Sequence, residues 1–302
     1  MQIAYVGLGA MGFAMAGHIA DRLKYDGQPP LLAYNRTKAR AEQLKEKHPV
    51  QVVDSLAQVA QADIIFTCLL NDKAVQEVVQ GLLDQGLKQN TILVEQSTID
   101  PVLAQELASK VANVGAHYMA CPIMGPPLKA QAADLTILMA GPIPQRSAIK
   151  PLLVNVIGKK LIELGEPVEE AVKLKLCGNF FITSVIEMLA EGLTLGEKSG
   201  AGQDKVVELL HCVFPGTLLG AYADRMLKNT YNSEVHFPIT SAKKDVNHIL
   251  HLARSSNVDL PITDLMLQHL DEAQAVKGDV DLSAVVGALR QHAGLDFDLN
   301  KP

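Results

Sequence analysis

The sequence has little cysteine: four residues in 302, far apart and without a CxxC pair or a paired histidine spacing (Cys68, Cys121, Cys177 and Cys212). This spacing argues against a disulfide framework and against a zinc module. We therefore interpret the four cysteines as buried free thiols.

Basic patches are also lacking. The formal net charge is -6, and the Lys159-Lys160 and Lys243-Lys244 pairs are isolated, so we expect no nucleic-acid partner. No apolar run approaches the roughly 20 residues of a membrane helix, and the first run, Ile3–Val6, is typical of a strand rather than a signal peptide. We expect a cytoplasmic protein without a membrane partner.

Short runs rich in β-branched residues alternate with helical stretches through the first half of the chain. This alternation predicts an α/β Rossmann-type, doubly wound parallel sheet with helices on both faces. The expected strands are Ile3–Val6, Leu31–Tyr34, Val50–Val53, Ile64–Leu69, Ile92–Glu95, Tyr118–Pro122 and Leu135–Met139. The expected helices between them include Met11–Leu23, Ala39–Lys47, Ala74–Leu83 and Val102–Val114.

The strand pattern stops after Leu161–Leu164, and Gly165-Glu166-Pro167 interrupts the chain. One long helix is expected from Val168 to about Lys198, apolar on more than one face, so other helices should bury it. The segments 204–213, 216–228, 242–255, 264–277 and 282–292 also have helical patterns. We therefore expect a Rossmann domain over residues 1–165 and an all-α domain over 166–302, joined by the long helix.

A glycine-rich loop, Gly7-Leu8-Gly9-Ala10-Met11-Gly12, follows the first expected strand and opens the first expected helix. In this context Gly7 allows a tight turn, Gly9 lets backbone amides approach phosphate, and Gly12 lets helix and strand pack closely. A helix N-terminus also attracts negative charge. The loop therefore predicts a site for the pyrophosphate of a nicotinamide dinucleotide.

The second expected strand ends at Asn35-Arg36-Thr37-Lys38. Proteins that use NAD usually place an acidic residue here, which binds the ribose 2′-hydroxyl and would repel a 2′-phosphate. A guanidinium pairs bidentately with phosphate, and Asn35 and Thr37 have hydrogen bonds to donate. We therefore expect NADP(H) in preference to NAD(H); the alternative is that Arg36 and Lys38 belong to a solvated loop.

Further motifs are Glu95-Gln96-Ser97-Thr98 before Asp100-Pro101, Lys175-Leu176-Cys177-Gly178-Asn179, Ala190-Glu191-Gly192, and Phe237 ahead of Lys244-Asp245. With the glycine loop they resemble the β-hydroxyacid dehydrogenase family over nearly the whole chain. The glyoxylate/succinic semialdehyde reductase branch is most similar, through Asn35-Arg36-Thr37 and Gly278-Asp279-Val280-Asp281. The resemblance implies hydride transfer between a nicotinamide and a small carbonyl or hydroxy compound.

The resemblance also implies that a lysine on the long helix donates or accepts the proton, and Lys175 holds that position. Asn179 is four residues further along the expected helix and shares its face, so both side chains could reach one substrate oxygen. An ammonium beside the carbonyl would stabilise the developing alkoxide and then protonate it. Lys173 is the rival, but it lies on a different face.

Other contacts follow from the resemblance by position. Leu69 and Leu70 would pack near the nicotinamide half of the cofactor, and Thr98 would lie beside its ring. Lys244 would approach the cofactor from the helical domain, and Phe237 would help close the cleft over the substrate. Plain core packing is the alternative for the two leucines.

The substrate loop departs from the family pattern Asp-Ala-Pro-Val-Ser-Gly-Gly. It reads Ala120-Cys121-Pro122-Ile123-Met124-Gly125-Pro126-Pro127, so Met124 replaces a serine and Pro126 removes one backbone donor. We expect Ile123, Met124 and Gly125 to contact substrate, together with Thr98 and Asn179. A flexible apolar Met124 favours a bulkier or less polar substrate, although Gly125 and Thr98 could still bind one carboxylate oxygen.

These motifs favour an NADPH-dependent reductase of a small aldehyde, keto acid or related carbonyl. An imine reductase with an apolar cleft is one alternative, although such relatives typically replace the lysine retained here. A non-catalytic NADP-binding structural or regulatory protein is the other. No metal site is expected at Asp245, His248 and His251, and the resemblance implies a homodimer.

Overall fold

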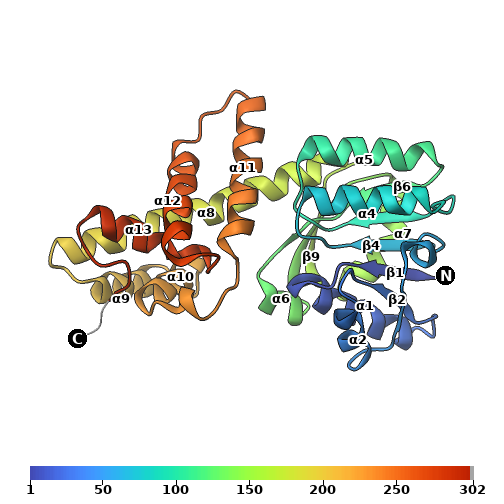
Figure 1. Cartoon of the computed structure of the whole chain (residues 1–302), viewed down its shortest axis with the longest axis horizontal. Coiled ribbons are helices and arrows are strands. Elements are labelled where there is room, and N and C mark those ends of the chain that lie inside the picture. The colour runs from blue at the N-terminus through green and yellow to red at the C-terminus, as the bar shows by residue number, and fades with distance from the viewer. Residues whose placement is uncertain (300–302) are drawn as a thin grey trace. The chain divides into compact units, whose positions relative to one another are not determined.

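The computed structural model describes residues 1–299 and divides into two compact units, Met1–Lys175 and a second from Leu176 onward. The first unit contains the doubly wound sheet and the second is helical (Figure 1). The fold class predicted from the sequence is confirmed. The domain boundary between residues 165 and 166 stays a prediction.

Six parallel strands form the main sheet, in the order β3-β2-β1-β4-β5-β6. Val6 of β1 is in register with Tyr34 of β2 and Thr67 of β4, so the chain leaves these three strands at one edge. Open α/β sheets bind ligands at this edge, where the strand order reverses. The strands are β1 (Ile3–Val6), β2 (Leu31–Tyr34), β3 (Val50–Val52), β4 (Ile64–Thr67), β5 (Ile92–Glu95) and β6 (His117–Ala120).

Helices cover both faces of this sheet (Figure 1). Successive strand side chains point to opposite faces, so Ile3 and Tyr5 join one buried apolar cluster while Ala4 and Val6 join the other. The first cluster is closed by α1 (Ala10–Tyr25), α2 (Lys38–Lys45), α6 (Pro127–Gln131) and α7 (Ile143–Leu153). The second is closed by α3 (Leu56–Val59), α4 (Asp72–Asp84) and α5 (Pro101–Asn113).

The last predicted strand of the main sheet lies in a separate sheet. β8 (Leu135–Met139) pairs antiparallel with β7 (Ile123–Met124) and parallel with β9 (Gly158–Glu163). The apolar pattern of β8 correctly indicated an extended buried segment, but such a pattern does not specify the neighbouring strand. This pairing fixes the start of the substrate loop, because β7 contains Ile123 and Met124.

The second unit packs its helices around a continuous apolar core that includes Leu193, Val246, Met266, Leu270 and Val285. Burying each such side chain stabilises the fold by roughly 1.5–3 kcal/mol. Its elements are α8 (Glu169–Lys198), which begins in the first unit, α9 (Gln203–Val213), α10 (Leu218–Leu227), α11 (Ile239–Ser255), α12 (Pro261–Lys277), α13 (Val285–His292) and the short 3-10 helices η1 (Thr230–Asn232) and η2 (Leu282–Ala284).

Helix α8 is long and apolar enough to cross a membrane by length and composition, so the expectation that no stretch meets this criterion was wrong. A single such helix is a weak indication, because the core helix of a soluble protein meets the same criterion. Within its most apolar window, 44% of the residues are buried in the fold. The cytoplasmic location stays a prediction.

The interpretation of all four cysteines as buried thiols needs correction. Cys121 is buried and Cys68 is half-buried, whereas Cys177 and Cys212 are exposed. The two exposed residues lie on α8 and α9, whose apolar composition made their solvent-facing positions hard to recognise. All four are free thiols, as predicted.

Candidate functional site

The predicted glycine loop lies between the carboxyl end of β1 and the start of α1. Gly7 has a φ of +94°, a conformation that side chains rarely adopt. A β-carbon at Gly7 would clash with the Cys68 carbonyl oxygen, and one at Gly12 would clash with the Gly7 carbonyl oxygen. Glycine is therefore required at both positions for the strand and the helix to approach closely.

The N-terminus of α1 opens onto free space. Gly9 is the N-cap residue, and a β-carbon there would meet nothing within 4 Å among the described residues. Within residues 1–299 no side chain caps this helix end, and its first turn contains no acidic residue. The unpaired N–H groups and the positive end of the helix dipole fit a pyrophosphate. The loop therefore fits a dinucleotide cofactor.

Asn35 stabilises this loop through hydrogen bonds. Its Oδ1 accepts a hydrogen bond from the Leu8 N–H at 2.9 Å, and its Nδ2 donates to the Thr37 carbonyl at 3.0 Å. Arg40 adds a second link, because its Nε donates to the Leu8 carbonyl oxygen at 3.2 Å. The amide of Asn35 therefore holds the end of β2 against the glycine loop.

The Arg36 side chain is exposed and makes no hydrogen bond or ion pair with any of residues 1–299. Thr37 is also exposed, and Lys38 pairs with Asp54 at 2.6 Å. Because the Lys38 ammonium is already paired with a carboxylate, Arg36 is the cation of this segment that is best placed to bind a 2′-phosphate.

A buried polar network supports the carboxyl ends of β4 and β5. The Leu69 N–H donates to Ser97 Oγ at 2.7 Å, and the Ser97 N–H donates to Glu95 Oε1 at 2.6 Å. Thr67 Oγ1 donates to the other Glu95 oxygen at 2.7 Å. Burial raises the pKa of Glu95, and the hydrogen bonds from Ser97 and Thr67 act in the opposite direction.

This network positions two loops, the one after β4 that contains Leu69 and Leu70 and the one after β5 that contains Thr98. Leu69 is half-buried and packs against the core, whereas 69% of Leu70 is exposed. Glu95 and Ser97 were not expected to support the site, although an acidic residue ending a buried apolar strand was a usable signal. Thr98 is half-buried in the same segment.

Lys175 lies beside the substrate loop. Its Nζ donates to Met124 Sδ at 3.4 Å, and both side chains are half-buried. Lys173, the rival, is paired with Glu170 at 2.8 Å. The structure thus brings together Lys175 and Met124, two residues 51 positions apart in the sequence.

The other residues of the substrate loop are fixed by core packing and by the backbone conformation of the turn. Ile123 is buried in the core and pairs with Ile137 across β7 and β8. Gly125 has a φ of +138°, and a β-carbon there would lie 2.8 Å from Leu135. Pro126 is the N-cap residue of α6 and offers no N–H. Met124 is therefore the large side chain that this turn directs toward Lys175.

The other predicted residues lie in the second unit. Asn179 is 4% exposed, and its Nδ2 donates to Asp245 Oδ2 at 2.6 Å. Lys244 Nζ forms an ion pair with Asp245 Oδ1 at 2.9 Å. Asp245 therefore links Asn179 with Lys244, a role that sequence reasoning missed. Phe237 is half-buried, packs against the helical core and donates its N–H to Asp281.

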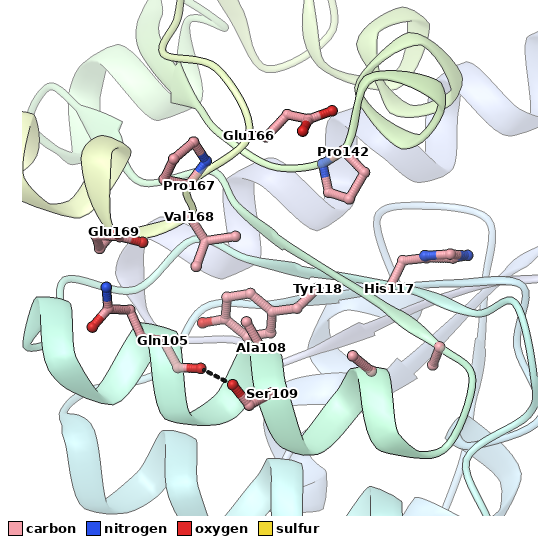
Figure 2. A pocket seen from close by; sticks show the side chains of 12 residues that line it. Gln105, Ala108, Ser109, His117, Tyr118, Pro142, Glu166, Pro167, Val168 and Glu169 are labelled. Atoms are coloured by element: carbon pink, nitrogen blue, oxygen red, sulfur yellow. Dashed lines mark hydrogen bonds between the residues drawn. The ribbon is translucent and has the colours of Figure 1, made fainter.

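A hollow of about 360 Å³ lies on the first unit (Figure 2). Its lining includes Gln105 and Ser109 of α5, Tyr118 of β6 and Val168 ahead of α8. The buried Tyr118 hydroxyl has no hydrogen-bond partner within residues 1–299. The hollow contains none of the residues predicted for the cofactor or the substrate.

Comparison with known proteins agrees with this organisation. Residues 2–165 match the NAD binding domain of 6-phosphogluconate dehydrogenase, and residues 170–289 match the NAD-binding domain of NADP-dependent 3-hydroxyisobutyrate dehydrogenase. An NADH-dependent oxidoreductase of Aspergillus ustus is 31% identical in an alignment of 292 residues that covers 95% of this chain and 98% of that protein.

Two further proteins extend the comparison. Glyoxylate/succinic semialdehyde reductase 1 of Arabidopsis thaliana is 28% identical over 301 residues, covering 96% of this chain and 99% of the relative. The crystal structure of 3-hydroxyisobutyrate dehydrogenase from Salmonella typhimurium superimposes with a TM-score of 0.83 at 18% identity, covering 95% and 99% of the two chains. This second match supports the fold.

The fold, the glycine loop and these matches define an NAD(P)-binding oxidoreductase that acts on hydroxyl or carbonyl groups. More particularly, the chain belongs to the β-hydroxyacid dehydrogenase family. The family resemblance and the enzyme class predicted from the sequence are both confirmed.

Proposed function

We propose that this protein is an NADPH-dependent reductase that transfers hydride to a small carbonyl compound, with Lys175 as the proton donor. The observation that carries the proposal is the half-buried Lys175 ammonium, which lies 3.4 Å from Met124 of the substrate loop. The rival Lys173 is held by Glu170.

When bound, the reduced nicotinamide supplies the hydride. The N-terminus of α1 at Gly9 would hold the pyrophosphate and Arg36 the 2′-phosphate. The Lys175 ammonium stabilises negative charge that develops on the substrate oxygen and then donates the Nζ proton to it. Asn179 lies one helical turn along α8 and is oriented by Asp245, so we assign it the same substrate oxygen.

The substrate loop favours a less polar substrate than the hydroxy acids of the wider family. Met124 presents a thioether beside Lys175 where a serine hydroxyl would bind a carboxylate. Pro126 removes a further donor. We infer that uncharged aldehydes are reduced at least as efficiently as glyoxylate or succinic semialdehyde. NADPH oxidation should be measured with these aldehydes and with cyclic imines. Turnover of the imines in preference to the aldehydes would indicate an imine reductase. Cofactor binding without turnover of any substrate would indicate a non-catalytic protein.

The NADPH preference rests on Arg36. Arg36→Glu should lower the ratio of kcat/KM for NADPH to kcat/KM for NADH at least about tenfold, because a charge-assisted contact with phosphate contributes roughly 1.5–3 kcal/mol and a carboxylate would repel it. Steady-state kinetics with both cofactors measures the ratio. Lys45→Glu makes the same charge change at an exposed position of α2 and should leave it unaltered.

A wild-type preference for NADH would contradict this assignment, and so would an unchanged ratio in Arg36→Glu. A preference for NADH would match the name of one relative, the NADH-dependent oxidoreductase of Aspergillus ustus.

We also propose that the protein forms a homodimer through α8. This helix exposes Phe181, Met188 and Leu195, with exposed fractions of 67%, 48% and 69%. Residues seven apart lie on one helix face, so the three side chains form an apolar stripe. A stripe of this kind is typical of a surface that a second chain covers.

A further inference from the structure

The helical unit contains a second group of potential ligands that the proposed reaction does not use. His269 and Glu272 lie three residues apart on α12, and His292 ends α13. One ligand atom of each lies within 4.8 Å of the other two. His292 Nε2 is 2.8 Å from Glu272 Oε2, and the two imidazole ring centroids are 5.4 Å apart.

A buried carboxyl group stands behind this cluster. Glu187 of α8 is 0% exposed, and its Oε1 lies 2.6 Å from His269 Nδ1. Its other oxygen is buried and has no hydrogen-bond partner within residues 1–299. Leaving such an oxygen unpaired costs free energy, so packing alone does not account for a glutamate at this position.

The contact between Glu187 and His269 has the arrangement found behind metal-bound histidines. There one ring nitrogen binds the ion and the other passes its N–H to a carboxylate, which fixes the tautomer and the ring orientation. With Nδ1 occupied by Glu187, His269 has Nε2 left to bind an ion. The carboxylate also makes the ring a stronger electron donor.

The ligand types decide which ion fits. Two imidazoles and one carboxylate suit Zn²⁺ and neighbouring transition metals, whereas Mg²⁺ and Ca²⁺ prefer oxygen ligands throughout. With bonds of about 2.0–2.2 Å, the ligand atoms of a tetrahedral site lie roughly 3.4 Å apart. The His292–Glu272 pair is already close, and the 52% exposed His292 side chain is free to adjust toward the buried His269.

We propose that His269, Glu272 and His292 bind a divalent transition-metal ion of the Zn²⁺ class, with Glu187 positioning His269 and water completing the shell. Its ligands belong to α12 and α13, whereas Asp245, His248 and His251 belong to α11. The bound ion would connect α12 to α13 and stabilise the helical unit. Solvent reaches it past Glu272 and His292, whose side chains are 34% and 52% exposed.

Calorimetric titration of untagged, chelator-treated full-length protein with ZnCl₂ tests the proposal. Wild type should bind one equivalent and gain thermal stability. His292→Ala and Glu272→Gln should each lower the affinity more than about tenfold, since even partners of the ligands contribute that much. His251→Ala removes another exposed histidine and should bind as wild type does. Both ligand variants alter exposed or half-exposed side chains, so the fold should persist.

Two results would overturn the proposal: no Zn²⁺ binding by wild type, or equal affinity in wild type and His292→Ala. Glu187→Gln tests the positioning role separately, since it keeps the volume of the side chain. It should lower Zn²⁺ affinity about 10–100-fold without changing the one-to-one stoichiometry, and unchanged affinity would exclude Glu187 from the site.

Discussion

Glu95 is a buried carboxyl group that positions the loop containing Thr98, although its burial disfavours the ionised form. It is 2% exposed, and both of its carboxyl oxygens accept hydrogen bonds, from the Ser97 N–H and from Thr67 Oγ1. These bonds hold the segment that leads to Thr98, while burial raises the pKa of the carboxyl group. Folding therefore disfavours the ionised form of Glu95 relative to the unfolded chain.

Glu95 should make stability depend on pH. Because its pKa is higher in the folded than in the unfolded chain, its contribution is fully present below about pH 4.3, the ordinary glutamate value, and is lost as pH rises through the raised pKa. Glu95→Gln cannot ionise, yet its amide offers an acceptor to Ser97 and a donor to Thr67. Urea unfolding should show wild type losing stability relative to Glu95→Gln as pH rises.

Glu163 provides a matched comparison with the opposite sign. Lys150 and Arg146 hold its pKa below the ordinary value, so wild type should gain slightly over Glu163→Gln as pH rises. The gain is small because the Lys150 and Glu163 side chains are exposed. Parallel pH profiles for wild type and Glu95→Gln would contradict the role given to Glu95.

At the residue scale the sequence specified backbone requirements better than side-chain partners. Gly7 and Gly12 follow from the motif, because any β-carbon would clash at both positions. The Asn35 amide links Leu8 to Thr37, which the motif did not indicate, while its hydrogen bond to phosphate stays a prediction. Ile123 lies in the core, and its contact with substrate stays a prediction. Leu8 is 27 positions from Asn35, and Ile123 pairs with Ile137 of another strand, contacts that local patterns do not reveal.

At the scale of elements, α8 was predicted almost to its ends. The helical period of its apolar residues and the glycine after its last turn indicate where this helix runs and where it ends. The pairing of β8 with β7 and β9 was not predictable, since apolar strands of the two sheets look alike in sequence. Two-residue β7 and four-residue α3 are too short to show a period.

The exposed stripe of α8 leads to a prediction about assembly. Met188→Glu places a charge in the middle of Phe181, Met188 and Leu195, and burying an unpaired carboxylate in an interface is costly. Light scattering after size-exclusion chromatography should give a dimer for wild type and a monomer for Met188→Glu. Val276→Glu alters an exposed apolar residue of α12 and should remain dimeric. A monomeric wild type, or a dimeric Met188→Glu, would exclude this interface.

At the scale of the whole molecule, the sequence correctly predicted an α/β sheet followed by helices, together with the family and the enzyme class. Alternation of strands and helices, and its end after residue 164, carry that information. The chemistry is less accessible, because the predicted residues fall into two sets: Gly9, Arg36 and Lys175 in the first unit, and Asn179 and Lys244 in the second. Only Lys175 and Asn179 are related by a local repeat, the turn of α8.

In the proposed reaction Lys175 donates the proton, while other residues of the first unit bind the cofactor. Turnover of the best aldehyde and the NADPH dissociation constant should therefore be measured together for Lys175→Ala, with Lys173→Ala as control. Lys175→Ala should lower kcat about 10²–10⁴-fold and leave NADPH affinity nearly unchanged, while Lys173→Ala behaves as wild type. Near-normal turnover in Lys175→Ala, or the loss of turnover in Lys173→Ala instead, would exclude Lys175 as the proton donor.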